Sequence, residues 1–104
     1  MLSLKPSHFQ ILKNILGEYY ETAYVFGSFA IGSQHFNSDF DLCLKITLSP
    51  QKMFVLKDEI MESNFPFIVD LSLFSSFSVA FKRVIEPSLV KLSEFEKNLN
   101  QKNS

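Results

Sequence analysis

The chain has 104 residues, of which 46% are hydrophobic, and a net charge of −1, which suits one soluble domain that buries a core without a metal or disulfide staple. Its nine lysines and single arginine do not predict an extended nucleic-acid surface, and its single cysteine excludes an internal disulfide and favours a reducing compartment. The sequence has no apolar run of about eighteen residues and no secretion-signal pattern, so we expect no membrane span and a cytoplasmic protein.

The first half of the chain predicts one helix and two strands. Ser7 is a candidate N-cap, and the apolar residues after it recur at spacings of three and four, which indicates an amphipathic helix. These apolar residues are Phe9, Leu12, Leu16 and Tyr19. The β-branched and aromatic residues of 22–26 predict a strand. The polar residues 32–38 predict a loop, and residues 39–47 predict a second strand that begins with two acids.

The next segment predicts a second helix and a third strand. Ser49 followed by Pro50 is typical of a helix start, with the serine as N-cap and the proline at the first helical position. The buried face of this helix is marked by Met53, Leu56 and Ile60. Residues 67–74 are nearly continuously apolar, as expected of a central strand, and Asp70 is the one charge within them.

The last third of the chain predicts a helix over residues 76–86, a short edge strand over 88–92, and a polar tail over 93–104 that is frayed or helical. The apolar positions of the helix are Phe77, Phe81 and Val84. We expect a single domain over residues 1–104 with its core at about 7–92. The fold class is α/β (α+β), with a mixed sheet of three to four strands, helices mainly on one side, and the acids at one end.

Two acids and a glycine-serine turn carry the functional signal. Asp39 and Asp41 are two residues apart, so on a strand both carboxylates point to the same face. Like charges held together favour a bound cation, and carboxylate oxygens suit a hard ion such as Mg²⁺, which takes further ligands from water and substrate phosphates. Gly27 and Ser28 form a turn where the backbone can approach a phosphate closely.

These residues resemble the pattern of the polymerase-beta-type nucleotidyltransferase superfamily, and the small size resembles its minimal (MNT) branch. The resemblance runs over about residues 23–92. It rests on two motifs ten residues apart, Phe26-Gly27-Ser28 and Asp39-Phe40-Asp41-Leu42. It implies a palm-like sheet and a nucleoside triphosphate substrate such as ATP. It also implies that two Mg²⁺ ions lie between the acids and the phosphates.

The resemblance also implies a role for a third acid. On residue type alone, Asp70 is equally well read as a solvated acid at a strand end. Family members carry a third acid on a strand beside the acid pair, and Asp70 falls at that place. The resemblance therefore implies a metal-binding and catalytic cluster of Asp39, Asp41 and Asp70. Gly27, Ser28 and Ser38 would form the nucleotide-binding part of the site: Gly27 and Ser28 would bind the triphosphate, and Ser38 would orient or cap the acidic strand.

One residue departs from the family pattern. Many minimal members have arginine where this chain has Ile31, and an aliphatic side chain cannot replace the contacts of a guanidinium. Minimal members of the family are typically paired with a small helical HEPN ribonuclease toxin, and the MNT antitoxin transfers AMP from ATP to a tyrosine of that toxin. The resemblance thus implies a protein adenylyltransferase antitoxin with a HEPN partner.

Two alternatives to this function stay open. In the first, the chain is a weak or inactive MNT subunit that neutralises its HEPN partner by binding, with Ile31 as the trace of lost activity. In the second, which we weight less, it transfers a nucleotidyl group to a small molecule such as an aminoglycoside. The sequence is compatible with a homo-oligomer and leaves the preferred base of the nucleotide open.

Overall fold

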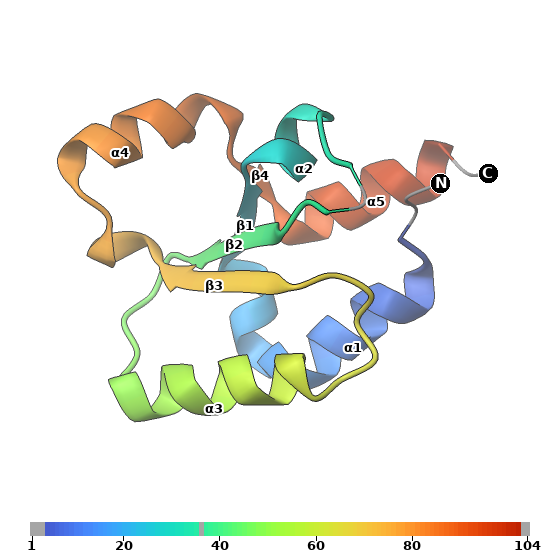
Figure 1. Cartoon of the computed structure of the whole chain (residues 1–104), viewed down its shortest axis with the longest axis horizontal. Helices are drawn as coiled ribbons and strands as arrows, with labels where there is room; N and C mark the ends of the chain where they lie inside the picture. The colour runs from blue at the N-terminus through green and yellow to red at the C-terminus, as the bar shows by residue number, and fades with distance from the viewer. Residues whose placement is uncertain (1–3, 36, 103–104) are drawn as a thin grey trace.

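The computed structural model describes residues 4–35 and 37–102 and contains a four-stranded mixed sheet (Figure 1). The strand order is β3-β2-β1-β4; β1 pairs antiparallel with β2 and β4, and β2 pairs parallel with β3. The strands are β1 (Ala23–Phe26), β2 (Phe40–Leu44), β3 (Val69–Leu73) and β4 (Val90–Lys91). Within the described residues the α-helices are α1 (Pro6–Leu16), α2 (Ser28–Ile31), α3 (Pro50–Met61), α4 (Val79–Ile85) and α5 (Leu92–Lys102). The predicted fold class is confirmed.

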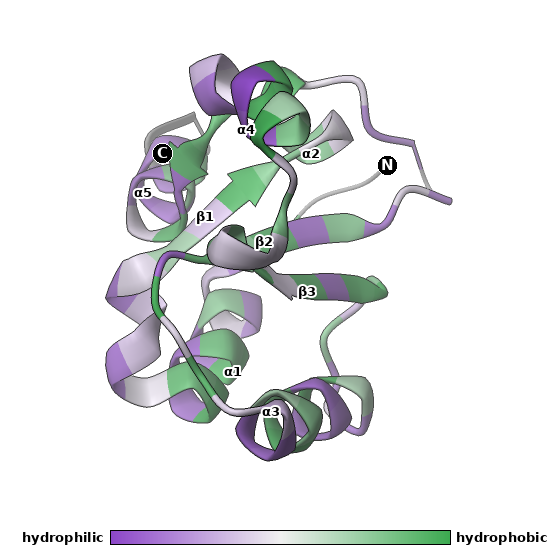
Figure 2. Ribbon diagram, turned by 90° about the vertical axis from the view of Figure 1, so that its left-hand side faces the viewer, coloured by the Kyte–Doolittle hydropathy of each residue, from purple (hydrophilic) through white to green (hydrophobic). Residues whose placement is uncertain are grey.

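The two faces of the sheet carry different cores. Alternate residues of β2 point to opposite faces, so Phe40, Leu42 and Leu44 enter the main core while Asp41 and Cys43 point the other way. The main core is completed by side chains from α1, α3 and α5. Figure 2 shows α1 and α3 on one side of the sheet and α4 on the other. Helices therefore lie mainly on one side, as predicted, and the acidic face is the one that α4 partly covers.

The sequence predicted the start of α3 correctly but not the start of α1. Ser49 caps α3 as predicted, because its Oγ accepts a hydrogen bond from the N–H of Lys52 at 3.1 Å. The predicted cap at Ser7 is wrong: α1 already begins at Pro6, with Lys5 as its N-cap. Proline suits the first helical position because its φ is fixed and that position needs no N–H.

The predicted central strand is wrong in its place within the sheet. β3 is shorter than residues 67–74 and lies at the edge, outside β2, and only Leu71 of its five residues is fully buried. Its apolar composition has a different origin: one face of β3 packs on the main core, and Ile68, just before the strand, remains 74% exposed. The acidic strand is also shorter than predicted, since β2 begins only at Phe40.

The helix predicted over 76–86 forms, but with another buried face. α4 begins at Val79, and Ser78 caps it by accepting a hydrogen bond from the N–H of Phe81 at 3.1 Å. Its buried side chain is Ile85, whereas Val84 is 73% exposed. Phe81 contacts Phe26 of β1, and Ile85 lies in the second core with Phe26 and Cys43, so these two residues pack the helix on the acidic face of the sheet.

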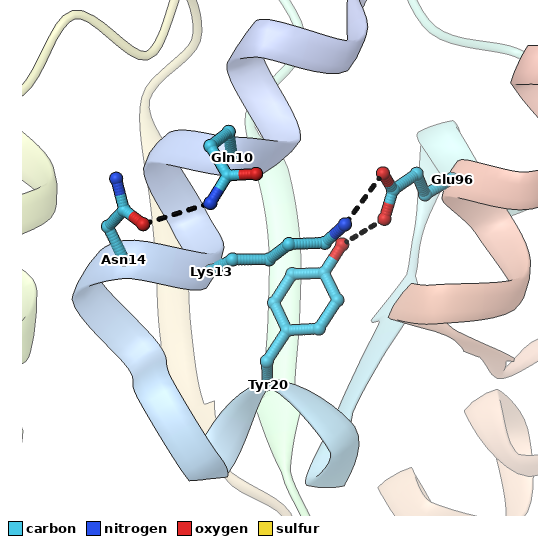
Figure 3. Close-up of polar contacts among 5 residues, drawn as sticks. All are labelled: Gln10, Lys13, Asn14, Tyr20 and Glu96. Carbon is cyan, nitrogen blue, oxygen red and sulfur yellow. Dashed lines mark hydrogen bonds and ion pairs between the residues drawn. The ribbon is translucent and has the colours of Figure 1, made fainter.

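The segment after Leu92 forms α5 and packs against the rest of the fold. Leu92 is fully buried, and Phe95 and Leu99 pack on the main core. Glu96 joins α5 to the first helical segments: one carboxylate oxygen lies 3.0 Å from the Nζ of Lys13, and the other accepts a hydrogen bond from the hydroxyl of Tyr20 at 2.8 Å (Figure 3). Burial and this hydrogen bond raise the pKa of Tyr20, which therefore stays protonated as a donor.

We expect Glu96→Ala to destabilise the fold by about 1–2 kcal/mol, because the buried Tyr20 hydroxyl and Lys13 both lose a charged partner. Urea unfolding at neutral pH measures the change. Glu94→Ala is the matched control, since Glu94 is exposed on the same helix, and its effect should stay within about 0.5 kcal/mol. Equal losses in the two variants would contradict a stabilising function of the Glu96 contacts.

No helix in the described ranges 4–35 and 37–102 has the length and apolar character needed to span a bilayer.

Candidate active site

The glycine-serine turn connects β1 to α2 on the acidic face of the sheet. Gly27 follows the last residue of β1 and has φ 75° and ψ −152°, a conformation that L side chains rarely adopt. Its carbonyl accepts hydrogen bonds from the N–H groups of Ala30 (3.1 Å) and Ile31 (3.3 Å). Ser28 is the first residue of α2. Only a residue without a side chain makes this turn at low cost, which explains the glycine of the motif.

Asp41 lies directly against Gly27. Antiparallel pairing of β1 with β2 sets Phe26 opposite Asp41, one residue before the turn. A Cβ added to Gly27 would collide with the Oδ2 of Asp41 and would lie 3.2 Å from its Cγ. The glycine of the first motif therefore makes room for the acid of the second motif. This contact brings the two motifs together in space.

Asp70 stands beside Asp41 on the neighbouring strand. The parallel register of β2 and β3 pairs Asp41 with Asp70, so their side chains leave the same face of the sheet. Asp39 lies two residues before Asp41, outside β2, and is exposed. The structure thus brings the predicted acids to one end of the sheet, with Asp41 and Asp70 in register and Asp39 at the loop.

The electrostatics of Asp41 show that the acids act on one another. Partial burial, followed by the charges of Asp70 and Asp39, raises the pKa of Asp41 from 3.8 to about 6. Burial and two like charges all disfavour the ionised form of Asp41. A bound cation would reverse this balance and restore an ordinary carboxylate pKa.

The donor set fits a hydrated divalent ion better than a closed protein cage. In the residues that the structure describes, no three side chains of His, Cys, Asp or Glu are grouped so that they could hold a metal ion, and this includes the predicted trio of Asp39, Asp41 and Asp70. Mg²⁺ seldom requires such a cage, since it usually takes one or two carboxylates and completes its shell with water and substrate phosphates. Two carboxylates in register beside a turn with no side chain, at Gly27, match that requirement.

Ser38 closes the loop that leads into Asp39. Its Oγ accepts a hydrogen bond from the N–H of His35 at 2.9 Å, and its own N–H donates to the His35 carbonyl at 2.8 Å. The N–H of Asn37 donates to the Nδ1 of His35 at 3.2 Å. These bonds fix the approach to the acidic strand. The part assigned to Ser38 in nucleotide binding stays a prediction.

An aromatic cluster that the sequence did not predict lies beside the acids. Phe26 contacts the rings of Phe77 and Phe81, with centroids 5.7 and 6.2 Å away, on the same face as Asp41. Cys43 is buried in this second core, where burial raises its thiol pKa to about 11 and leaves it unreactive. The available signal was the apolar spacing of the 76–86 segment, but that pattern does not tell which face of the sheet the helix covers.

Ile31, at the position where many minimal members have arginine, ends α2 and is 65% exposed. It borders a shallow hollow of about 320 Å³ between α2 and α5, whose wall includes Gln34 and Asn98. An exposed aliphatic side chain near the Gly27-Ser28 turn cannot make an ionic contact with a phosphate. The position is free for contact with another molecule.

Comparisons with known proteins support this fold. A solved structure described as "Crystal structure of the toxin-antitoxin with AMP-PNP" has the same fold, with a TM-score of 0.61 and 22% sequence identity over 90% of this chain and 85% of that chain. A search of curated proteins finds no match. The family model "Polymerase beta, Nucleotidyltransferase" matches residues 10–95, which include both motifs and Asp70. The chain therefore belongs to the polymerase beta nucleotidyltransferase family.

Proposed function

We propose that the chain is a Mg²⁺-dependent protein adenylyltransferase that acts as an antitoxin by transferring AMP from ATP to a tyrosine of a HEPN ribonuclease toxin. The observation that carries the proposal is the contact of Asp41 with Gly27, with Asp70 in register beside it. It sets two carboxylates next to a turn where phosphates can approach the backbone. The solved structure of similar fold is described as a toxin-antitoxin with AMP-PNP, which favours a protein partner and an adenine nucleotide.

In this proposal the three acids share the metal ions, and Asp70 has a second task. Asp39 and Asp41, with Asp70 beside them, would hold two Mg²⁺ ions, which when bound neutralise charge on the phosphates. Asp70 is the exposed acid on the edge strand, so a hydroxyl from another protein can reach it. It accepts the proton of the acceptor tyrosine, whose oxygen bonds to the α-phosphorus of ATP. The bond from that phosphorus to the bridging oxygen breaks, and pyrophosphate leaves.

The remaining site residues position the nucleotide. Gly27 leaves room for the Asp41 carboxylate, Gly27 and Ser28 would bind the triphosphate, and Ser38 holds the loop before Asp39 in a fixed shape. This division of labour suits nucleotidyl transfer, in which the protein contributes mainly by positioning the groups and stabilising charge. The aromatic cluster of Phe26, Phe77 and Phe81 lies next to these residues, on the same face of the sheet as Asp41.

The test is transfer of AMP to the small helical protein encoded next to this chain. Incubation with ATP and Mg²⁺ should increase the intact mass of that partner by one adenylyl group, located on tyrosine by peptide mass spectrometry. Asp70→Asn should slow transfer by about 10²–10⁴-fold, because the acceptor hydroxyl loses its general base, while nucleotide binding is retained. Glu59→Gln, at an exposed acid on α3, is the control and should transfer normally. An unmodified partner with the unsubstituted chain would refute the proposal.

A second candidate function is neutralisation of the partner by binding alone, which the exposed Ile31 favours. In that case the double variant Asp39→Ala and Asp41→Ala would form the complex and suppress the toxin as fully as the unsubstituted chain. In the adenylyltransferase case the same variant binds but no longer suppresses the toxin. Growth of cells that express both proteins separates the two outcomes.

A further inference from the structure

An apolar groove runs along the free edge of the sheet, on the side opposite to β4. It has a volume of about 470 Å³ and lies between α3 and the segment that leads into β3. Three of its apolar side chains are largely exposed: Phe54 at 69%, Met61 at 74% and Ile68 at 74%. Figure 1 shows α3 running alongside β3 at this edge. Such a concentration of exposed apolar side chains on one small domain indicates an interaction surface.

The backbone of β3 defines what can bind along this edge. The N–H of Phe40 donates to the carbonyl of Ile68 at 2.8 Å, so in this parallel pair the backbone groups of even-numbered residues point towards β2. Those of Val69, Leu71 and Leu73 consequently point outward. Within residues 4–35 and 37–102, the hydrogen bond recorded for these outward groups is that of the Ser76 hydroxyl to the Leu73 carbonyl. A strand edge on which most of the outward backbone groups have no such partner can be completed by another β-strand.

We propose that this strand is β3 of a second copy, so that two chains form a two-fold symmetric dimer with one continuous eight-stranded sheet. With the axis at Leu71, the outward groups of Leu71 pair with those of its symmetry mate. Val69 pairs with Leu73 of the second copy, and Leu73 with Val69. All three outward residues of β3 are then used, which is the most that an antiparallel pairing of this strand can achieve.

The charges favour this register over the alternative one residue away. An axis at Asp70 would set the two Asp70 side chains directly opposite each other, at the closest spacing between antiparallel strands, and would leave Leu73 unpaired. With the axis at Leu71, each Asp70 faces Ser72 of the other copy, and the two acids lie on a diagonal at roughly 7–8 Å. The uncharged Ser72 thus makes the edge of β3 complementary to itself.

The groove is compatible with antiparallel pairing of β3 in either register. Val69, Leu71 and Leu73 lie on the face that packs on the main core, which is also the face that α3 covers. Antiparallel pairing of β3 therefore brings the grooves of the two copies to the same side of the shared sheet. Lys57 and Asp58 both border the groove, and so each copy offers a cation and an anion to its mate. The acidic faces of both copies lie together on the opposite side of the sheet.

The test is the mass of the full chain in solution. Light scattering over a wide concentration series should give twice the 12.0 kDa mass of the chain at the upper end. Ile68→Lys places a charge in the groove at an exposed position, so the fold is kept while the dimer dissociation constant rises at least about tenfold. Val84→Lys is the matched control, since Val84 is 73% exposed on the other side of the sheet, and it should dimerise normally.

Hydrogen exchange identifies the strand involved. The amides of Val69 and Leu71 should exchange slowly at concentrations where the chain is dimeric and quickly where it is monomeric. A monomer at every concentration, a dimer that Ile68→Lys leaves unchanged, or β3 amides whose exchange is independent of concentration would each overturn the proposal. None of these readouts involves nucleotide, so the dimer and the adenylyltransferase proposals fail or stand separately.

Discussion

Asp41→Asn should lower AMP transfer by about 10³-fold or more, which makes it one of the two most damaging substitutions expected in this chain. The amide keeps the size of the carboxylate but loses the charge that a divalent ion needs. Asp41 also contacts Gly27 and lies in register with Asp70. Loss of its charge therefore affects both the surroundings of the Gly27-Ser28 turn and the acid pair. Single-turnover transfer to the partner measures the loss.

The same substitution should stabilise the metal-free protein at neutral and alkaline pH. The pKa of Asp41 is raised from 3.8 to about 6, first by burial and then by Asp70 and Asp39, so the folded state prefers the protonated acid. This preference supports the fold fully below about pH 4 and is lost as the pH rises through about 6. At pH 8 the ionised acid opposes folding. Because solvent screens a half-buried group, we expect Asn to restore about 1 kcal/mol there.

Thermal unfolding without metal at about pH 8 and pH 4.5 tests this expectation. Asp41→Asn should raise Tm at the higher pH, and the gain should shrink at the lower pH, where Asp41 of the unsubstituted chain is largely protonated. Mg²⁺ with nucleotide should then raise the Tm of the unsubstituted chain but not of the variant. Glu59→Gln, at an exposed acid on α3, should behave like the unsubstituted chain in all of these measurements. A gain independent of pH would contradict the electrostatic origin.

The parts of the fold that the sequence predicted are those set by local chemistry. Ser49 and Pro50 begin α3 because a cap and a fixed φ act within one turn. The alternation in residues 40–44 separates a core face from an acidic face because side chains on a strand alternate whatever the partner strand. The Gly27-Ser28 turn and the acids were predicted because their spacing is a property of the family.

The parts that the sequence did not predict depend on contacts between distant segments. An apolar run such as 67–74 is compatible with a central strand and with an edge strand beside a groove, and the strand order decides between them. The polar residues around Glu96 gave no sign that its carboxylate binds Tyr20 and Lys13, which precede it by 76 and 83 residues. The contact between Gly27 and Asp41 likewise exists only once β1 and β2 are paired.

Gly27→Ala is the second substitution with a large expected effect, and it affects stability and activity together. At φ 75° and ψ −152°, alanine is strained, and its Cβ would overlap the Oδ2 of Asp41. The strain and the overlap together should cost about 2–4 kcal/mol of folding free energy. Asp41 must also turn away to make room, so AMP transfer should fall even under conditions where the variant is folded.

Gly32→Ala is the matched control for this substitution. Gly32 has a similar φ of 78° with ψ 17°, in the left-handed helical region, and a Cβ added there meets nothing within 4 Å. Its cost should therefore be only the conformational one, about 1 kcal/mol, with AMP transfer retained. Urea unfolding of both variants separates the backbone conformation from the contact with Asp41.

A double-mutant cycle then isolates that contact. In the background of Asp41→Ala the carboxylate is gone, so Gly27→Ala should cost at least about 1 kcal/mol less than in the unsubstituted chain. Gly32→Ala should cost the same in both backgrounds, because no side chain lies near it. Strict additivity of Gly27→Ala and Asp41→Ala would mean that glycine is needed at residue 27 for its backbone conformation alone. In that case the two motifs would not meet in the way that the proposed nucleotide site requires.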